Sequence, residues 1–200
     1  MIAWADLRAD PRGAMPVEAP AAVLLLGAAT SERREALRRL AAGILREPGL
    51  ALVHRDGFAP RVAGPDPDRL RLSSASRSPF AALAASPWPI GIDVEVVDER
   101  AEPPWGVLHP AERHHLRALA AESRAVAAAR LWSVKEAYLK AIRRGLSRDP
   151  ASFAVLGLNG ARPLIDDPLA PAPVVHLATR TIAAGETTAM VAVVVLGRSP

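Results

Sequence analysis

The order of hydrophobic and polar residues in the first half of the chain predicts a helix flanked by short strands. Residues 23–26 form a short apolar run that is typical of a strand. Apolar residues then recur at helical spacing from 37 to 45, and a Pro-Gly pair at 48–49 ends that helix. Residues 50–54 and 70–73 have the length and composition of further strands. The first half therefore combines one helix with several short strands.

The second half repeats this combination after a proline-rich bend at 86–89. Residues 90–96 alternate strictly between apolar side chains and glycine or acidic side chains, which predicts a strand with one buried face. A helix is predicted to begin near 109–112, and a longer one covers about 123–144. Strand-like runs follow at 153–158, 174–181 and 189–196. A helix with short strands, occurring twice, predicts an α+β fold with mostly antiparallel sheets.

Two acidic residues share one face of the predicted strand 90–96. Ile92 and Val94 point to the face opposite Asp93 and Glu95. A face open to water explains this pattern and is common in antiparallel sheets. A cation between the two carboxylates explains it as well, because it would offset their repulsion. Magnesium binds few protein carboxylates and completes its shell with water and phosphate oxygens. The strand is therefore a candidate magnesium site, with a solvated face as the alternative.

A third acidic residue and a lysine share one side of the predicted helix 123–144. Spacing by four places Trp132, Glu136 and Lys140 on that side, with Lys135 directed elsewhere. A surface Glu–Lys pair, worth ~0.3–0.5 kcal/mol, explains this without any function. Alternatively, Glu136 completes a metal site with the strand acids, and Lys140 neutralises a phosphate oxygen. That arrangement suits phosphoryl-type transfer, where catalysis is mainly positioning and electrostatic stabilisation.

Composition narrows the function classes without choosing one. The 25 Lys and Arg residues exceed the 21 Asp and Glu residues, which favours phosphorylated or acidic partners. The chain has no cysteine, which excludes disulfides and thiolate nucleophiles and is compatible with a reducing cytosol. The apolar segment 21–29 follows two arginines as in a signal peptide, but acidic residues and prolines interrupt that pattern. We expect a cytoplasmic protein without a membrane span, since no apolar run reaches ~18 residues.

Two motifs, in this order and at this spacing, resemble the signature motifs of the 4′-phosphopantetheinyl transferases. The first is Gly-Ile-Asp-Val-Glu at 91–95, and the second is Trp-Ser-Val-Lys-Glu-Ala at 132–137, followed by Lys140. Because a long segment precedes the first motif, the chain resembles the Sfp-like class. This implies a pseudo-dimer of two similar α/β subdomains, each a helix packed on a small, mostly antiparallel sheet. The implied division is 1–88, on the coenzyme A phosphate side, and 89–200, which carries the magnesium-binding motifs.

The resemblance implies magnesium-dependent transfer of the 4′-phosphopantetheine group from coenzyme A to a serine of an acyl or peptidyl carrier protein, releasing adenosine 3′,5′-bisphosphate. Asp93, Glu95 and Glu136 match the magnesium ligands of the family. Lys140 matches the lysine that contacts the coenzyme A phosphates. Glu136 or a metal-bound water is the candidate base. Glu112 resembles an acidic position between the motifs and is a further candidate for activating the attacking serine.

The resemblance also implies further coenzyme A contacts. Lys135 matches the motif lysine just before the glutamate, and Arg39 lies where family members place an arginine that reaches the 3′-phosphate. Before the first motif the family commonly has Asn-x-Ser-His-Ser, and here Ser74 stands in the histidine position. Serine still donates one hydrogen bond, and Arg71 or Arg77 supplies charge nearby. The departure affects coenzyme A binding more than it affects the chemistry.

Two other functions are compatible with the sequence. The missing histidine motivates a non-catalytic relative that binds carrier protein or coenzyme A. The positive charge motivates a nucleic-acid binder, but aromatic residues are few and no binding motif is present, so no nucleic-acid partner is expected. We expect a monomer that acts on an acidic carrier protein.

Overall fold

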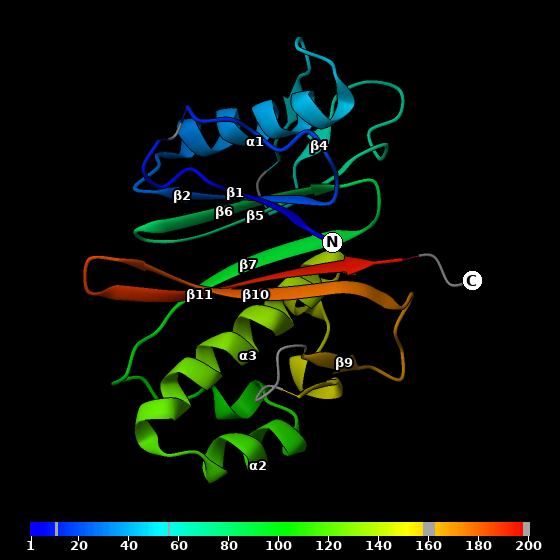
Figure 1. The fold of residues 1–200 in the computed structure, drawn as a ribbon. Coiled ribbons are helices and arrows are strands. Elements are labelled where there is room, and N and C mark those ends of the chain that lie inside the picture. Colours follow the sequence, from blue (N-terminus) through cyan, green and yellow to red (C-terminus); the bar gives the residue numbers. More distant parts are fainter. Residues whose placement is uncertain (11, 56, 158–162, 198–200) are drawn as a thin grey trace.

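The computed structural model describes residues 1–10, 12–55, 57–157 and 163–197, and it consists of two helix-and-sheet layers stacked sheet to sheet (Figure 1). Helix α1 (Thr30–Leu45) covers the outer face of the first sheet. That sheet has the order β1 (Ala3–Asp6), β2 (Ala21–Leu26), β6 (Phe80–Ser86), β5 (Arg71–Arg77), β4 (Arg61–Val62) and β3 (Leu52–Val53). Strands β1 and β2 pair in parallel, and the other neighbours are antiparallel.

The second layer is built around helix α3 (Ala121–Ala141). Its antiparallel sheet has the order β10 (Val174–Ala184), β11 (Thr187–Leu196) and β7 (Ile90–Val96). Helix α2 (Pro110–Ala118) packs beside α3, and β8 (Ala154–Leu156) pairs with β9 (Leu164–Asp166). Short 3₁₀ turns complete this half at Trp105–Val107, Gly145–Ser147 and Pro150–Ser152. The structure thus confirms the predicted α+β class with mostly antiparallel sheets.

Three hydrophobic clusters hold the layers together. One lies between α1 and the first sheet, and a second lies between α3 and the second sheet. The third lies between the two sheets and contains side chains from both, among them Phe80, Ile92 and Val193. The division expected at residues 88 and 89 falls in the connection from β6 to β7. That division remains a prediction, because the third cluster joins the two halves.

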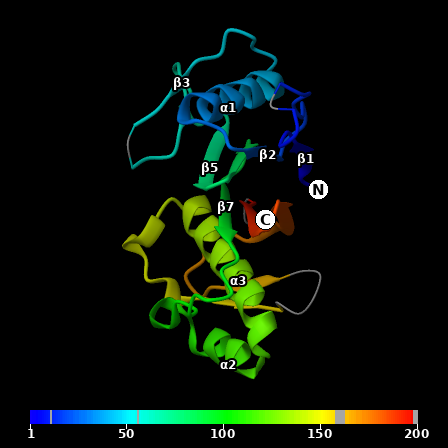
Figure 2. The same ribbon diagram turned by 90° about the vertical axis from the view of Figure 1, so that its left-hand side faces the viewer.

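Strand β7 follows the alternation expected from its sequence. Ile90, Ile92 and Val94 are buried in the cluster between the sheets. The opposite face, with Asp93, lies against α3, which runs alongside β7 (Figure 2). The face that carries the two acids is therefore covered by a helix, so its simplest explanation as an open solvated face does not apply.

Helix α3 ends earlier than the sequence predicted. The expected helix reached 144, whereas the observed one ends at Ala141, and Arg143 adopts a left-handed conformation with φ of 56°. The helix end is closed by hydrogen bonds from Arg143 N to Lys140 O and from Arg144 N to Leu139 O. No helix in the described part of the chain is both long and apolar enough to cross a membrane.

Gly91 determines how closely β7 approaches α3. A Cβ atom at this position would lie 1.9 Å from Ala137 O and 2.7 Å from Ala141 N, which are backbone atoms of the helix. No side chain fits there unless the helix moves away from the strand. Because Asp93 and Lys140 lie on these two elements, the glycine also fixes the distance between their charged groups.

We therefore expect Gly91→Ala to lower the free energy of unfolding by ~1–3 kcal/mol, because the added methyl group overpacks the contact between strand and helix and forces their backbones to shift. Urea unfolding followed by circular dichroism measures the change. Gly106→Ala is the matched control, because a Cβ atom there meets nothing within 4 Å. The control is expected to change stability by less than about 0.5 kcal/mol. Equal stability of the two variants would contradict the close-packing argument.

Candidate active site

Three carboxylates and a lysine line one hollow between β5, β7 and α3. Asp93 and Glu95 come from the face of β7 that is turned to α3, and Glu136 and Lys140 are one turn apart on α3. The hollow has a volume of about 340 Å³. Its lining consists of Ala75, Ser76, Arg77, Asp93, Val94, Glu95, Trp132, Glu136, Lys140 and Leu146. The structure thus brings together the strand acids and helix residues that the sequence proposed as partners.

Asp93 is the most buried of the three acids. Its Oδ1 accepts a hydrogen bond from Lys140 Nζ at 2.7 Å, whereas its Oδ2 is buried without a hydrogen-bond partner in the structure. Burial raises the pKa of Asp93 to about 7, the nearby Lys140 ammonium offsets part of that rise, and repulsion from Glu95 and Glu136 adds to it. Burial also raises the pKa of Glu136, again opposed by Lys140.

Arg77 brings a second cation from the other half of the molecule. It lies on β5, and its guanidinium donates to Glu95 over distances of 3.1 and 3.3 Å. Its side chain is 60% exposed, whereas that of Glu95 is 15% exposed. Lys140 and Arg77 thus each neutralise one strand acid, which is why three acids can lie so close together.

The donor set fits a hard divalent cation only in part. Among the described residues, no group of three or more acids or histidines is arranged to hold a metal ion by itself. Lys140 and Arg77 already contact two of the acids. Carboxylate oxygens are nevertheless the ligands that Mg²⁺ prefers, and the Oδ2 atom of Asp93 lacks a partner. The site suits an ion that binds together with phosphate oxygens of a ligand, because these would complete its shell.

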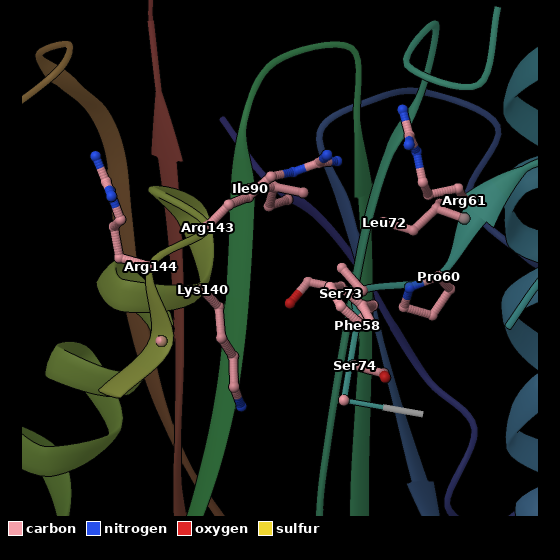
Figure 3. Close-up of a pocket in the computed structure, with 13 residues that line it drawn as sticks. Phe58, Pro60, Arg61, Leu72, Ser73, Ser74, Ile90, Lys140, Arg143 and Arg144 are labelled. Carbon is pink, nitrogen blue, oxygen red and sulfur yellow. The ribbon is translucent and has the colours of Figure 1, made fainter. Parts of the chain in front are cut away.

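A larger cleft adjoins this hollow, and Lys140 lines both of them. The cleft has a volume of about 580 Å³ and lies between β5, the start of β7, the end of α3 and the segment 57–61 (Figure 3). Four of its side chains are cationic, namely Arg61, Lys140, Arg143 and Arg144. The other lining residues are Gly57, Phe58, Ala59, Pro60, Leu72, Ser73, Ser74, Ile90 and Gly145. A cleft with this charge, next to an acidic hollow, suits a ligand that carries phosphates.

Ser73 ties the two walls of this region together. Its buried hydroxyl accepts a hydrogen bond from Ile92 N at 3.1 Å, so β5 is fixed against β7. In Figure 3 the Ser73 hydroxyl points toward β7, while Lys140 extends along that strand. Ser74 is exposed and lines the cleft, so the residue in the expected histidine position does reach it.

Arg39 does not reach this region in the structure. Its guanidinium donates to the carbonyl oxygens of Arg12 and Gly13, and the side chain lines none of the hollows described here. Two other arginines on α1 are better placed to contact a ligand in this region. Arg33 and Arg34 line a hollow of about 230 Å³ that they share with Ser74. The sequence could not distinguish them, because the choice depends on how α1 lies over β5.

Glu112 and Lys135 form a separate, fully buried ion pair. Lys135 Nζ lies 2.7 Å from Glu112 Oε1 and also donates to the carbonyls of Pro150 and Phe153. Glu112 accepts from the backbone N–H groups of His109 and Val155. Both side chains are at most 1% exposed and line none of the hollows described here. The structure therefore places both residues away from the hollows, closed off as a pair inside the core of the C-terminal half.

Several lining residues were not assigned to the site from the sequence. Arg143 and Arg144 lie at the end of the helix predicted over 123–144, where no site was predicted, and both line the cleft. Phe58, Pro60 and Arg61 line the cleft from the N-terminal half. The feature of the sequence that points to these residues is the density of arginine around them. It does not indicate that residues from the two halves of the chain line the same cleft.

Comparison with known proteins points to one family. The family profile described as the 4′-phosphopantetheinyl transferase superfamily matches residues 89–188. Among solved structures, the chain is similar to Thermotoga maritima holo-[acyl-carrier-protein] synthase (AcpS), at 24% identity and a TM-score of 0.43. That match covers 56% of this chain and 64% of the other. No curated protein sequence matches the chain.

The buried Glu112–Lys135 pair leads to a stability prediction. We expect Lys135→Met to lower the free energy of unfolding by ~3–5 kcal/mol, because it leaves the Glu112 charge buried and unpaired. Lys140→Met on the same helix is the comparison, since its side chain is 31% exposed and its buried partner Asp93, with a pKa raised to about 7, can take up a proton when the lysine is lost. Urea unfolding compares the two variants. A smaller loss in Lys135→Met than in Lys140→Met would argue against a structural role for the buried pair.

The raised pKa of Asp93 leads to a prediction about pH. An unfolded aspartate has a pKa of ~3.9, so between about pH 4 and 7 the folded protein keeps a proton that the unfolded chain has released. The free energy of unfolding therefore falls as the pH rises from about 4 to about 7, and it levels off above the folded pKa. Relative to Asp93→Asn, which cannot ionise, the wild type is expected to lose up to about 2.6 kcal/mol between pH 5 and 8. Chemical denaturation in the presence of a chelator measures both proteins, and parallel pH curves would contradict the shift.

Proposed function

Because this chain belongs to the 4′-phosphopantetheinyl transferase superfamily, we propose that it transfers the 4′-phosphopantetheine group of coenzyme A to a serine of a carrier protein. The observation that supports this most is that Asp93, Glu95, Glu136 and Lys140 share one hollow. That hollow adjoins a basic cleft large enough for a phosphorylated ligand. The two halves of the chain, both of which line the cleft, favour the Sfp-like class.

In this proposal, coenzyme A lies in the basic cleft with its diphosphate at Lys140. This residue lines both hollows, and its ammonium group is a compact charge that can hold a diphosphate oxygen while it remains close to Asp93. Asp93, Glu95 and Glu136 would hold Mg²⁺, which supplies charge neutralisation for the diphosphate and its leaving group. Ser74 offers one hydroxyl donor to the ligand from the opposite wall.

The reaction needs a base for the attacking serine. The hydroxyl oxygen of the carrier serine forms a bond to the phosphorus nearer the pantetheine, and the bond from that phosphorus to the bridging oxygen breaks. The leaving group is adenosine 3′,5′-bisphosphate. Glu136 is our candidate base, because it is half-buried, lines the same hollow and has a raised pKa. We prefer Glu136 to Glu112 for this role, since Glu112 is enclosed with Lys135.

The carrier protein is expected to be acidic. The chain has a net charge of +4, and arginines from both halves surround the cleft, so an acidic partner would be attracted to the correct side of the molecule. We propose that a monomer acts in the cytoplasm. The proposal covers carriers of polyketide, peptide and lipid assembly alike.

A direct test is mass spectrometry of an apo carrier protein incubated with the enzyme, coenzyme A and MgCl₂. We expect the carrier to gain the mass of phosphopantetheine, and a chelator to prevent it. Glu136→Gln is expected to slow transfer by at least about 100-fold, because it removes both the carboxylate charge at the proposed metal site and the candidate base. Glu122→Gln, an exposed change on the same helix, is the control and keeps the wild-type rate.

Two outcomes would overturn the assignment. A carrier that stays unmodified while coenzyme A still binds would favour the non-catalytic relative. Wild-type transfer by Glu136→Gln would remove Glu136 from the reaction.

A further inference from the structure

Arg143 occupies a backbone position that ordinarily belongs to glycine. It lies two residues after the last residue of α3, and its φ of 56° lies in the left-handed region, where a side chain is disfavoured. Arg46 is a second arginine of this kind, at the end of α1, with φ of 57°. Glycine at position 143 would relieve the backbone strain. The presence of arginine there suggests that its side chain makes interactions that offset this strain.

The Arg143 side chain crosses from the C-terminal half to the N-terminal half. Its guanidinium lies 3.5 Å from Asp68 Oδ1. The same oxygen is 3.0 Å from the guanidinium of Arg61 and 2.5 Å from that of Arg71. Three guanidinium groups thus converge on one carboxylate, which leaves an excess of two positive charges at this point. Such an excess attracts anions, and guanidinium groups match phosphate geometry well.

Two of the three arginines of this cluster line the basic cleft, and Arg71 adjoins them through Asp68 without lining it. Arg61 and Arg143 both line the cleft of about 580 Å³, and in Figure 3 they come from opposite walls, Arg143 from the end of α3 and Arg61 from β4. The acidic hollow, by contrast, is lined by Lys140 and by neither Arg61 nor Arg143. Burial and the neighbouring Arg71 lower the pKa of Arg143, which reflects the crowding of like charges.

We infer that Arg61, Arg71 and Arg143 form a phosphate-binding subsite of the cleft, separate from the contact of Lys140, with Asp68 as its internal counter-ion. In the absence of ligand Asp68 holds the three guanidinium groups together. When a phosphate binds, its charge balances the excess. The inference rests on the proposed function, since it takes coenzyme A as the ligand. The phosphate is either the 3′-phosphomonoester or the diphosphate of coenzyme A, which share the same chemistry.

The test uses Arg143→Gly, which removes the guanidinium and suits the left-handed backbone. Isothermal titration with coenzyme A and with 3′-dephospho-coenzyme A, both in a chelator, gives the Kd values. We expect the Kd for coenzyme A to rise about tenfold or more, as for the loss of one charge-assisted hydrogen bond. The melting temperature is expected not to fall, because the strain is relieved. Arg61→Gln is a second variant, expected to weaken binding in the same way.

Arg46→Gly is the matched control. It makes the same backbone change at an exposed helix end that lines none of the hollows described above. It is expected to leave both Kd values unchanged. Weaker binding of coenzyme A alone in Arg143→Gly assigns the 3′-phosphate to the subsite, and weaker binding of both ligands assigns the diphosphate.

Unchanged Kd values in folded Arg143→Gly and Arg61→Gln would overturn the subsite and leave the transferase proposal standing. Conversely, weakened binding in these variants together with a wild type that modifies no carrier would support the subsite and overturn the transferase proposal. A wild type that binds neither ligand would overturn the subsite.

Discussion

The close contact between β7 and α3 is the constraint on which the site depends. Gly91 leaves no room for a side chain between the strand and the helix backbone, and the two elements meet at that point. Two residues further along the strand, Asp93 is carried to Lys140 at 2.7 Å. The apolar face of the same strand is buried between the sheets, so the strand cannot rotate to release the acids. The apolar packing on one face of β7 therefore fixes the position of the acidic side chains on the other face.

Helix α3 carries two lysines in different environments, one buried and one partly exposed. Lys135 is enclosed with Glu112 and satisfies two backbone carbonyls, which holds the segment after α3 against the helix. Lys140 remains 31% exposed, shares its charge with Asp93 and borders both hollows. Removing one partner of an enclosed pair leaves a buried charge, whereas an ion pair at the edge of a cleft can exchange its partner for a ligand. The buried pair thus supports the helix that carries the exposed pair.

Both halves contribute charge to the seam between them. The family profile matches 89–188, but Arg61, Ser74 and Arg77 come from the preceding half. Arg77 pairs with Glu95, and Asp68 gathers arginines from either side of the cleft. The N-terminal half therefore lines the candidate site directly, even though its sequence departs most from the family pattern.

The sequence by itself determined the strand and the helix that carry the acidic residues and the faces on which these residues lie. Strict alternation in 90–96 predicted a strand with one buried face, and spacing by four placed Glu136 and Lys140 together on a helix, because both patterns follow from local backbone geometry. The α+β class followed from the same periodicities. These predictions hold in the structure because strand and helix periods do not depend on distant residues.

Only the tertiary structure decided which charged residues meet. It enclosed Glu112 with Lys135, left Arg39 bonded to a loop, and brought Arg143 across the cleft to Asp68. The sequence alone does not distinguish a charged side chain that is buried in an ion pair from one that is hydrogen-bonded to a carbonyl or directed into a cleft. Its role depends on burial and on partners far along the chain, and these are set when the two layers pack sheet to sheet.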